Sequence, residues 1–122
     1  MALHNDIGNY GEELACEHLK AKGFKILETN WKFSRAEVDI IAWDKKVLVF
    51  VEVKTRTSTS FGRPEAFVTK KKMKLLTQAA SFYSEKIGHD WEIRFDVVSV
   101  VDRKNKQPVV KHIEDAFFLG LK

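Results

Sequence analysis

The stretch from residue 37 to 54 constrains the fold more than any other part of the chain. It is rich in apolar and β-branched residues, yet it carries four charges in alternating positions, Glu37, Asp39, Glu52 and Lys54. Successive residues of a β-strand point to opposite faces, so Glu52 and Lys54 share one face while valines fill the other. The stretch therefore predicts two strands whose charges gather on one face.

A hairpin would place the charges of these two strands opposite each other. The expected strands are residues 37 to 43 and 46 to 54, joined by a turn around residues 44 to 47, and in this register Asp39 faces Glu52. Two carboxylates held together in poor solvent repel each other, which disfavours a purely structural role. A divalent cation such as Mg²⁺ resolves this conflict because it prefers carboxylate oxygens as ligands.

The composition is that of a single globular domain spanning residues 1–122. Hydrophobic residues make up 44% and charged residues 31% of the chain, and no apolar run approaches the length of a membrane span. Without a signal-like N-terminus, a cytoplasmic location and no membrane partner are expected by default. The single cysteine, Cys16, excludes an intrachain disulfide and is expected to fill the core. The histidines lack the spacing of metal ligands and are interpreted as surface or incidental residues, namely His4, His18, His89 and His112.

The positive charge is concentrated directly after the acidic stretch. The net charge is +4 and the pI is about 9.2, which favours a polyanionic partner. Between residues 54 and 74 only Glu65 is acidic, and the candidate nucleic-acid-binding residues there are Arg56, Arg63, Lys70, Lys71, Lys72 and Lys74. Such a run is either the solvated end of a helix or a surface that contacts backbone phosphates.

An amphipathic helix is predicted over residues 6 to 22, with Asp6 as its N-cap and Gly23 at its C-terminal stop. Helical periodicity turns Glu12, rather than its neighbour Glu13, toward the apolar side. Glu12 is therefore either a third acid that reaches the sheet or a helix-start glutamate favoured by the helix dipole. Both interpretations stay open at this stage.

A second helix is predicted from Lys70 to about Lys86, with Thr69 as its N-cap. Its apolar stripe runs from Lys72 through Leu76 to Phe82 and Tyr83, so Lys72 is the lysine expected to approach the acidic site from this helix.

Three further strands are predicted at residues 24 to 33, 91 to 101 and 109 to 113. The order of elements predicts an α/β fold, more closely an α+β mixed sheet, with a central mixed β-sheet flanked by the two main helices. Asp96 is another acid on a strand, but Arg94 lies on the same face and can pair with it, which indicates a structural role.

These motifs resemble the YraN family of uncharacterised endonuclease-like proteins, which belongs to the PD-(D/E)xK nuclease superfamily. The matching segments are Gly8-Asn-Tyr-Gly11-Glu12, Ala36-Glu37-Val-Asp39, Phe50-Val-Glu52-Val-Lys54-Thr-Arg56, Phe61-Gly62 and Arg94-Phe-Asp-Val-Val98. The resemblance implies the restriction-endonuclease-like fold and a likeness to archaeal Holliday junction resolvases. It further implies that the catalytic residues are Glu12, Asp39, Glu52 and Lys54, and that the three acids hold Mg²⁺ or Mn²⁺.

Three hypotheses about function follow. The first is a metal-dependent endonuclease that hydrolyses DNA, with branched or structured DNA as its substrate and, by analogy with resolvases, a homodimer as its assembly. The second is a nucleic-acid-binding module with a nuclease-like fold and no turnover. The third is a protein-interaction domain in which Lys54 pairs with Glu52 or Asp39 in a salt-bridge network.

Overall fold

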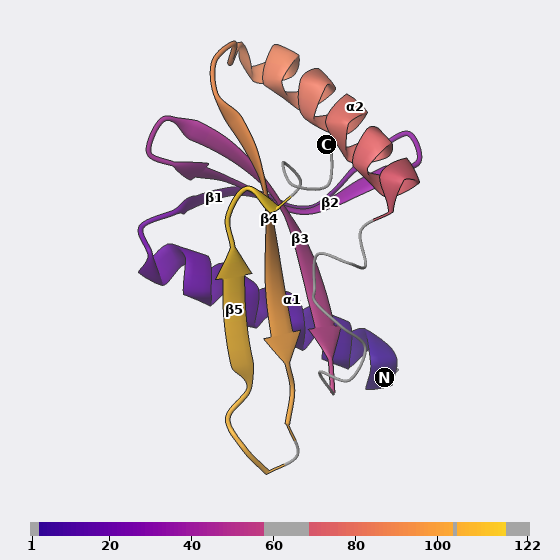
Figure 1. Ribbon diagram of the computed structural model, residues 1–122, viewed down its shortest axis with the longest axis vertical. Coiled ribbons are helices and arrows are strands. Elements are labelled where there is room, and N and C mark those ends of the chain that lie inside the picture. Colours follow the sequence, from indigo (N-terminus) through magenta and orange to yellow (C-terminus); the bar gives the residue numbers. More distant parts are fainter. Residues whose placement is uncertain (1–2, 58–68, 104, 117–122) are drawn as a thin grey trace.

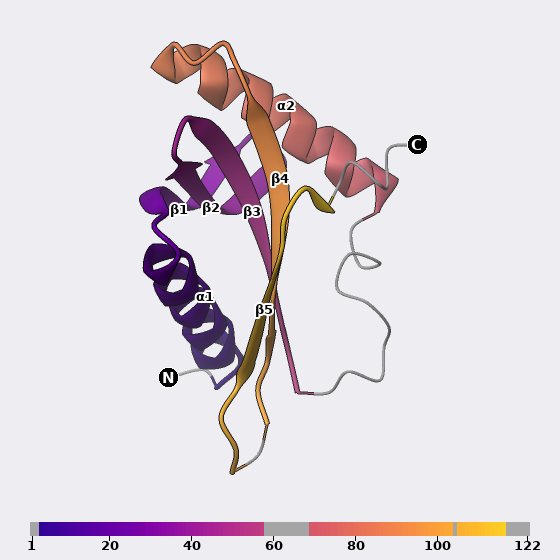
Figure 2. The ribbon, with the colours of Figure 1, turned by 60° about the vertical axis from the view of Figure 1, so that its left-hand side comes forward.

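The protein folds into a five-stranded mixed sheet with one helix on each face. The computed structural model describes residues 3–57, 69–103 and 105–116, with side chains from Tyr10 onward. In chain order the elements are α1 (Leu3–Ala21), β1 (Lys25–Phe33), β2 (Ala36–Asp44), β3 (Val47–Arg56), α2 (Lys70–Ile87), β4 (Ile93–Val101) and β5 (Val109–Ile113). The two helices lie on opposite sides of the sheet (Figures 1 and 2), as the sequence predicts.

The strands follow one another across the sheet in sequence order, from β1 at one edge to β5 at the other. Among the described strands, only the neighbours β3 and β4 are parallel, and the remaining neighbours are antiparallel. Parallel neighbours require a crossover connection, and α2 lies in that connection. The chain therefore leaves the sheet after β3, crosses one face as α2 and returns as β4 (Figure 1).

Each face of the sheet carries its own hydrophobic core. Ile41 and Phe50 pack on the α2 side, whereas their neighbours Ile40 and Val49 pack on the α1 side with Leu19. Consecutive strand residues alternate between faces, so the central strands are apolar on both sides. Any charge within these strands consequently lies among buried side chains.

The predicted hairpin register is correct but ends earlier than expected. Ile41 pairs with Phe50, and Asp44 pairs with Val47, as the sequence predicts. Counted away from the turn, the last regular pair is Ile40 with Val51. Asp39 is therefore the first residue of β2 that has no regular partner in β3.

The ends of the helices agree only in part with the predictions. The prediction that Asp6 caps α1 is wrong, because the helix already begins at Leu3. The apolar stripe that predicted this helix begins after the first helical turn, so its periodicity could not locate the first residue of the helix. Gly23 ends the helix with a φ of 96°, as expected, and Thr69 caps α2 by accepting a hydrogen bond from the N–H of Lys72 at 3.1 Å.

Two aromatic positions differ from the predictions. β4 begins at Ile93 instead of residue 91, because Trp91 lies in the preceding turn and donates its indole N–H to the carbonyl of Lys46 at 2.9 Å. Phe82 is 46% exposed. It lies at the edge of the apolar stripe of α2 and stacks on Phe33, with ring centroids 4.4 Å apart.

Two histidines were wrongly interpreted as surface or incidental, because His89 is buried and the side chain of His112 is 1% exposed. His112 donates from Nε2 to Asp96 at 2.7 Å, and Arg94 forms two further hydrogen bonds with the same carboxylate. These partners lower the pKa of Asp96 against the opposing effect of its burial. The structural interpretation of Asp96 agrees with this arrangement.

Candidate functional site

Glu52 is the most deeply buried acid of the acidic stretch. Its side chain is 4% exposed, on the face of the sheet that α2 covers. Lys72 from α2 contacts Oε1 through its ammonium group, and Lys54 Nζ lies 3.6 Å from the same oxygen. The other oxygen, Oε2, is buried and has no hydrogen-bond partner among the described residues. Because an unsatisfied buried carboxylate oxygen is costly, Glu52 is left with capacity for one more electropositive contact.

Asp39 lies where β2 departs from regular geometry. Val38 packs on the α2 side and Ile40 on the α1 side, so the alternation between faces changes at Asp39. Opposite this point in β1, Asn30 adopts a φ of 51°. The Asp39 carboxylate links β2 to β3 at this point, because its Oδ2 accepts the backbone N–H of Val53 at 2.7 Å.

The surroundings of Asp39 favour its protonated form. Its pKa is raised from 3.8 to about 7; burial is the largest cause, and the charges of Glu52 and Glu12 act in the same direction. The hydrogen bond from Val53 and the charge of Lys72 act in the opposite direction but are smaller than the combined increases. Asp39 thus titrates near neutral pH, as expected for an acid held beside other acids.

Glu12 approaches the acidic pair from the opposite face of the sheet. It is half-buried while Glu13 is exposed, which matches the predicted orientation. The helix reaches this position because Gly11 packs directly against Thr55, where an added Cβ would lie 2.9 Å from the Thr55 Cβ. A residue larger than glycine would push α1 away from β3.

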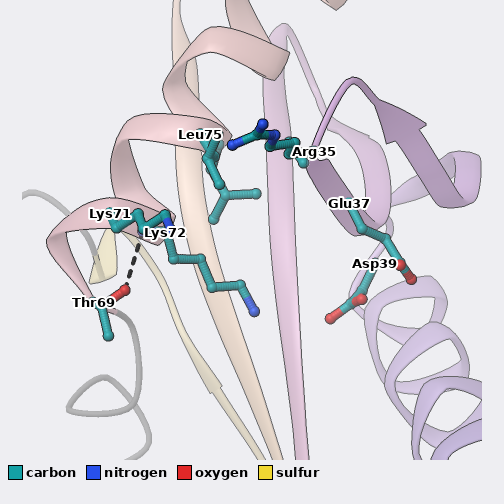
Figure 3. A pocket seen from close by; sticks show the side chains of 9 residues that line it. Arg35, Glu37, Asp39, Thr69, Lys71, Lys72 and Leu75 are labelled. Atoms are coloured by element: carbon teal, nitrogen blue, oxygen red, sulfur yellow. Dashed lines mark hydrogen bonds between the residues drawn. The ribbon is translucent and has the colours of Figure 1, made fainter.

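A cavity of about 410 Å³ opens between α2 and the β1–β2 turn. Asp39, Glu37 and Arg35 line it from the sheet side, while Lys71 and Lys72 line it from the helix. The side chains of Lys72 and Asp39 point toward each other across the cavity (Figure 3). Acidic and basic groups therefore face one another in an accessible space.

The basic residues proposed to bind nucleic acid are divided between this cavity and the surface. Lys70, Lys71 and Lys74 are exposed on the first turns of α2, and Arg56 is half-buried at the end of β3. Lys72 differs from the other lysines of the run because its ammonium group turns inward to Glu52. Arg63 and the Phe61-Gly62 motif lie outside the described residues.

The described residues contain no group of three His, Cys, Asp or Glu side chains arranged to hold a metal ion. The residues nevertheless fit a cation that needs fewer protein ligands. Mg²⁺ is usually bound by one or two carboxylates together with water and substrate phosphate. The unpartnered Glu52 Oε2 and the raised pKa of Asp39 are the features expected of carboxylates that accommodate such a cation.

Several features of the site could not be read from the sequence. The hydrogen bond between Val53 and Asp39, the change of alternation at Asp39 and the contact of Gly11 with Thr55 all arise where elements meet. The sequence held one local signal for these features, namely Gly11 within a helical pattern. A glycine inside a helix often marks a place where another element packs closely against the helix backbone.

The mixed sheet, its two flanking helices and the acidic pair with adjacent lysines define an α+β domain of the restriction-endonuclease-like fold class. Within the described part of the chain, neither helix is long and apolar enough to span a bilayer.

The chain belongs to the uncharacterised protein family UPF0102, whose model matches residues 11–100; this is the YraN family that the motifs resemble. A UPF0102 protein of Flavobacterium psychrophilum is 49% identical to it, covering 97% of this chain and 98% of the relative. A relative from Flavobacterium johnsoniae is 44% identical, again covering 97% of this chain and 98% of the relative. One from Phocaeicola vulgatus is 40% identical, covering 97% of both. The family assignment therefore extends over nearly the whole chain.

Proposed function

We propose that this protein is a metal-dependent endonuclease that hydrolyses phosphodiester bonds of DNA, with branched or structured DNA as its substrate. The observation that carries the proposal is Glu52, a buried carboxylate with an unpartnered oxygen that lies beside Asp39 and two lysines. Burying two carboxylates side by side destabilises the fold unless positive charge or a proton offsets them, and both lysine contacts reach only one oxygen of Glu52. A functional site is the simplest reason to keep them.

Asp39 and Glu52 would hold Mg²⁺ or Mn²⁺, and Glu12 would complete or modulate the ligand set from α1. When bound, such a cation lowers the pKa of a coordinated water and offsets negative charge on the reacting phosphate. Asp39 must lose its proton to act as a ligand, and its pKa of about 7 allows this near neutral pH. Val53 keeps the carboxylate in place through its N–H.

The two lysines supply positive charge at the same point. The side chains of Lys54 and Lys72 are 30% and 35% exposed, so both ammonium groups can contact a phosphate that enters beside Glu52. Lys54 would orient the attacking water or contact the scissile phosphate. Positive groups placed where charge develops stabilise the transition state without further reorganisation.

The DNA backbone would lie along the start of α2. Lys70, Lys71 and Lys74 project from its exposed side, next to the cavity that Asp39 and Lys72 line. Together with Arg56 and Arg63, these residues would bind phosphates flanking the reacting one. Such contacts are independent of base sequence and weaken steeply as salt concentration rises.

The test is a cleavage assay with Mg²⁺ or Mn²⁺ on duplex, single-stranded, flap and four-way-junction DNA. We expect cleavage of at least one structured substrate, with losses of at least about 100-fold in Asp39→Asn and Glu52→Gln. Glu12→Gln and Glu13→Gln form a matched pair, because the two acids are adjacent and only Glu12 faces the sheet. Activity that survives both Asp39→Asn and Glu52→Gln would place the reaction elsewhere.

A nucleic-acid-binding module without turnover is the second candidate function. It is favoured by the contact of Lys72 with Glu52, because the ammonium group partly neutralises that acid without a metal ion. Salt-sensitive DNA binding with no cleavage of any substrate would support this alternative. If neither DNA nor a divalent cation binds, the same lysine contacts describe the salt-bridge network of a protein-interaction domain.

A further inference from the structure

A second cavity lies at the end of the sheet where three connections meet. It has a volume of about 390 Å³ and is lined by Gly23, Lys25, Trp43, Lys45, Lys46 and Trp91. These residues come from the α1–β1 connection, the adjoining ends of β1 and β2, the β2–β3 turn and the α2–β4 connection. The latter two connections lie at the same end of the molecule (Figure 2). No residue of the acidic site lines this cavity.

The aromatic wall of this cavity is held in place by buried contacts. His89 is 5% exposed and packs between the two tryptophans, with ring centroids 5.0 Å from Trp43 and 4.5 Å from Trp91. The histidine ring donates from Nε2 to the carbonyl of Glu92 at 2.8 Å, and the Trp91 indole donates to the carbonyl of Lys46. Trp91 is therefore fixed at one edge although the residue is 59% exposed.

A large aromatic side chain that is both fixed and exposed needs an explanation. Leaving the indole in water loses the stabilisation that its burial would bring, and the contacts with Lys46 and His89 cover only part of the ring, since the residue is 59% exposed. A preorganised exposed ring offers contact area at low entropic cost. Nucleobases stack on such a surface, and each stacked base contributes to the affinity.

The charges around the cavity point to the same class of ligand. All charged residues that line it are basic, namely Lys25, Lys45 and Lys46, and all three are exposed. The neighbouring acid Asp44 is paired with Arg94 at 3.0 Å, and neither Asp90 nor Glu92 lines the cavity. Lysines around an aromatic wall provide both phosphate contacts and a stacking surface.

We propose that this cavity binds an unpaired nucleotide of single-stranded DNA, with its base against Trp91 and its phosphates beside the three lysines. Val47 begins β3 at this end, and Glu52 lies five residues further, a separation of about 16 Å along the strand. One DNA molecule with an unpaired segment can therefore reach both sites. The site would select structured DNA over regular duplex. It shares the DNA partner of the proposed function but requires no metal ion.

The test measures the affinity of a fluorescein-labelled 12-nucleotide deoxythymidine strand by anisotropy in EDTA, so it is independent of cleavage. We expect Trp91→Ala to weaken binding by about tenfold, and Trp91→Phe to retain most of it. Both substitutions remove the hydrogen bond to Lys46, so their difference isolates stacking from any loosening of the turn. Val109→Ala changes another exposed apolar residue, on β5, and we expect it to have no effect.

The lysines are tested through the salt dependence of binding. Replacing all three with glutamine is expected to reduce the slope of log K against log salt concentration by about 2 in magnitude, since each phosphate contact to a single strand contributes about 0.7. Lys106→Gln, on the β4–β5 turn, serves as the single-charge control. Unchanged affinity in Trp91→Ala and unchanged slope in the lysine variant would overturn the proposal, as would absence of binding in EDTA. Loss of a dimer in Trp91→Ala, seen by sedimentation, would instead identify a self-association surface and reject the nucleotide site.

Discussion

The Asp39→Asn variant is expected to gain stability relative to the native protein as the pH rises from acid to alkaline values. The folded state raises the pKa of Asp39 from 3.8 to about 7, so the folded protein binds a proton that the unfolded chain has already released. The stability of the native protein should therefore fall as pH rises from about 4 to about 7 and stay low above that range. Asparagine carries no charge, and its side-chain oxygen can still accept the N–H of Val53.

The size of the effect follows from the two pKa values. One pKa unit corresponds to about 1.4 kcal/mol, so the complete shift is worth about 4 kcal/mol above pH 7. Between pH 5 and pH 8 the stability of Asp39→Asn relative to the native protein should increase by about 2.5 kcal/mol. Any constant difference from the substitution itself does not affect this pH-dependent part.

Urea unfolding at pH 5, 6, 7 and 8, in EDTA and at constant ionic strength, measures this difference. Glu37→Gln is the matched control, because Glu37 lies two residues away on β2 and is exposed; its stability should stay within about 0.5 kcal/mol of the native protein at each pH. A difference between Asp39→Asn and the native protein that is constant from pH 5 to pH 8 would refute the reasoning. Adding Mg²⁺ at 100 times its Kd, in buffer without EDTA, should stabilise the native protein by about 2.7 kcal/mol at pH 8. The Asp39→Asn variant should not be stabilised.

Three further predictions concern neighbouring contacts. Lys72→Met removes a positive charge that lowers the pKa of Asp39, so an NMR titration of the Asp39 carboxyl carbon should show a midpoint above 7; an unchanged or lower midpoint contradicts the reasoning. Gly11→Ala should cost about 1 to 3 kcal/mol of unfolding free energy despite its better helix propensity, because the new methyl group meets Thr55, and a Thr55→Gly background should remove most of that cost in a double-mutant cycle. Asp96→Ala should cost about 3 to 5 kcal/mol in chemical denaturation, because it leaves the buried His112 imidazole without its carboxylate partner and removes two hydrogen bonds from Arg94, which keeps its ion pair with Asp44; a loss below 1 kcal/mol would show that this network contributes little.

The local patterns of this sequence were sufficient to predict most of its elements. β5 coincides with its prediction, and the register of β2 with β3 follows the predicted pairing. Alternation also predicted that Glu52 and Lys54 share a face, and their ion pair is consistent with this. Helical periodicity turned Glu12 inward and placed Lys72 on the inner side of α2. These predictions succeeded because they depend on contacts within one element or between adjacent strands.

Predictions that depended on distant partners were less successful. His112 was interpreted as incidental, yet it is buried against Asp96 because β5 pairs with β4. Trp91 was assigned to a strand, but its indole bonds to a turn 45 residues earlier in the chain. Periodicity reports which side of an element a residue occupies, but it does not specify what lies on that side.

The sequence by itself determined which residues alternate within a strand, and therefore that Glu52 and Lys54 share one face of β3. Only the tertiary structure decided how those groups behave. The break in β2 pairing gave Asp39 the N–H of Val53, burial raised its pKa, and the packing of α2 brought Lys72 to Glu52. The physical reason is that face and register follow from local chain geometry, whereas desolvation and charge interactions depend on which elements enclose a group.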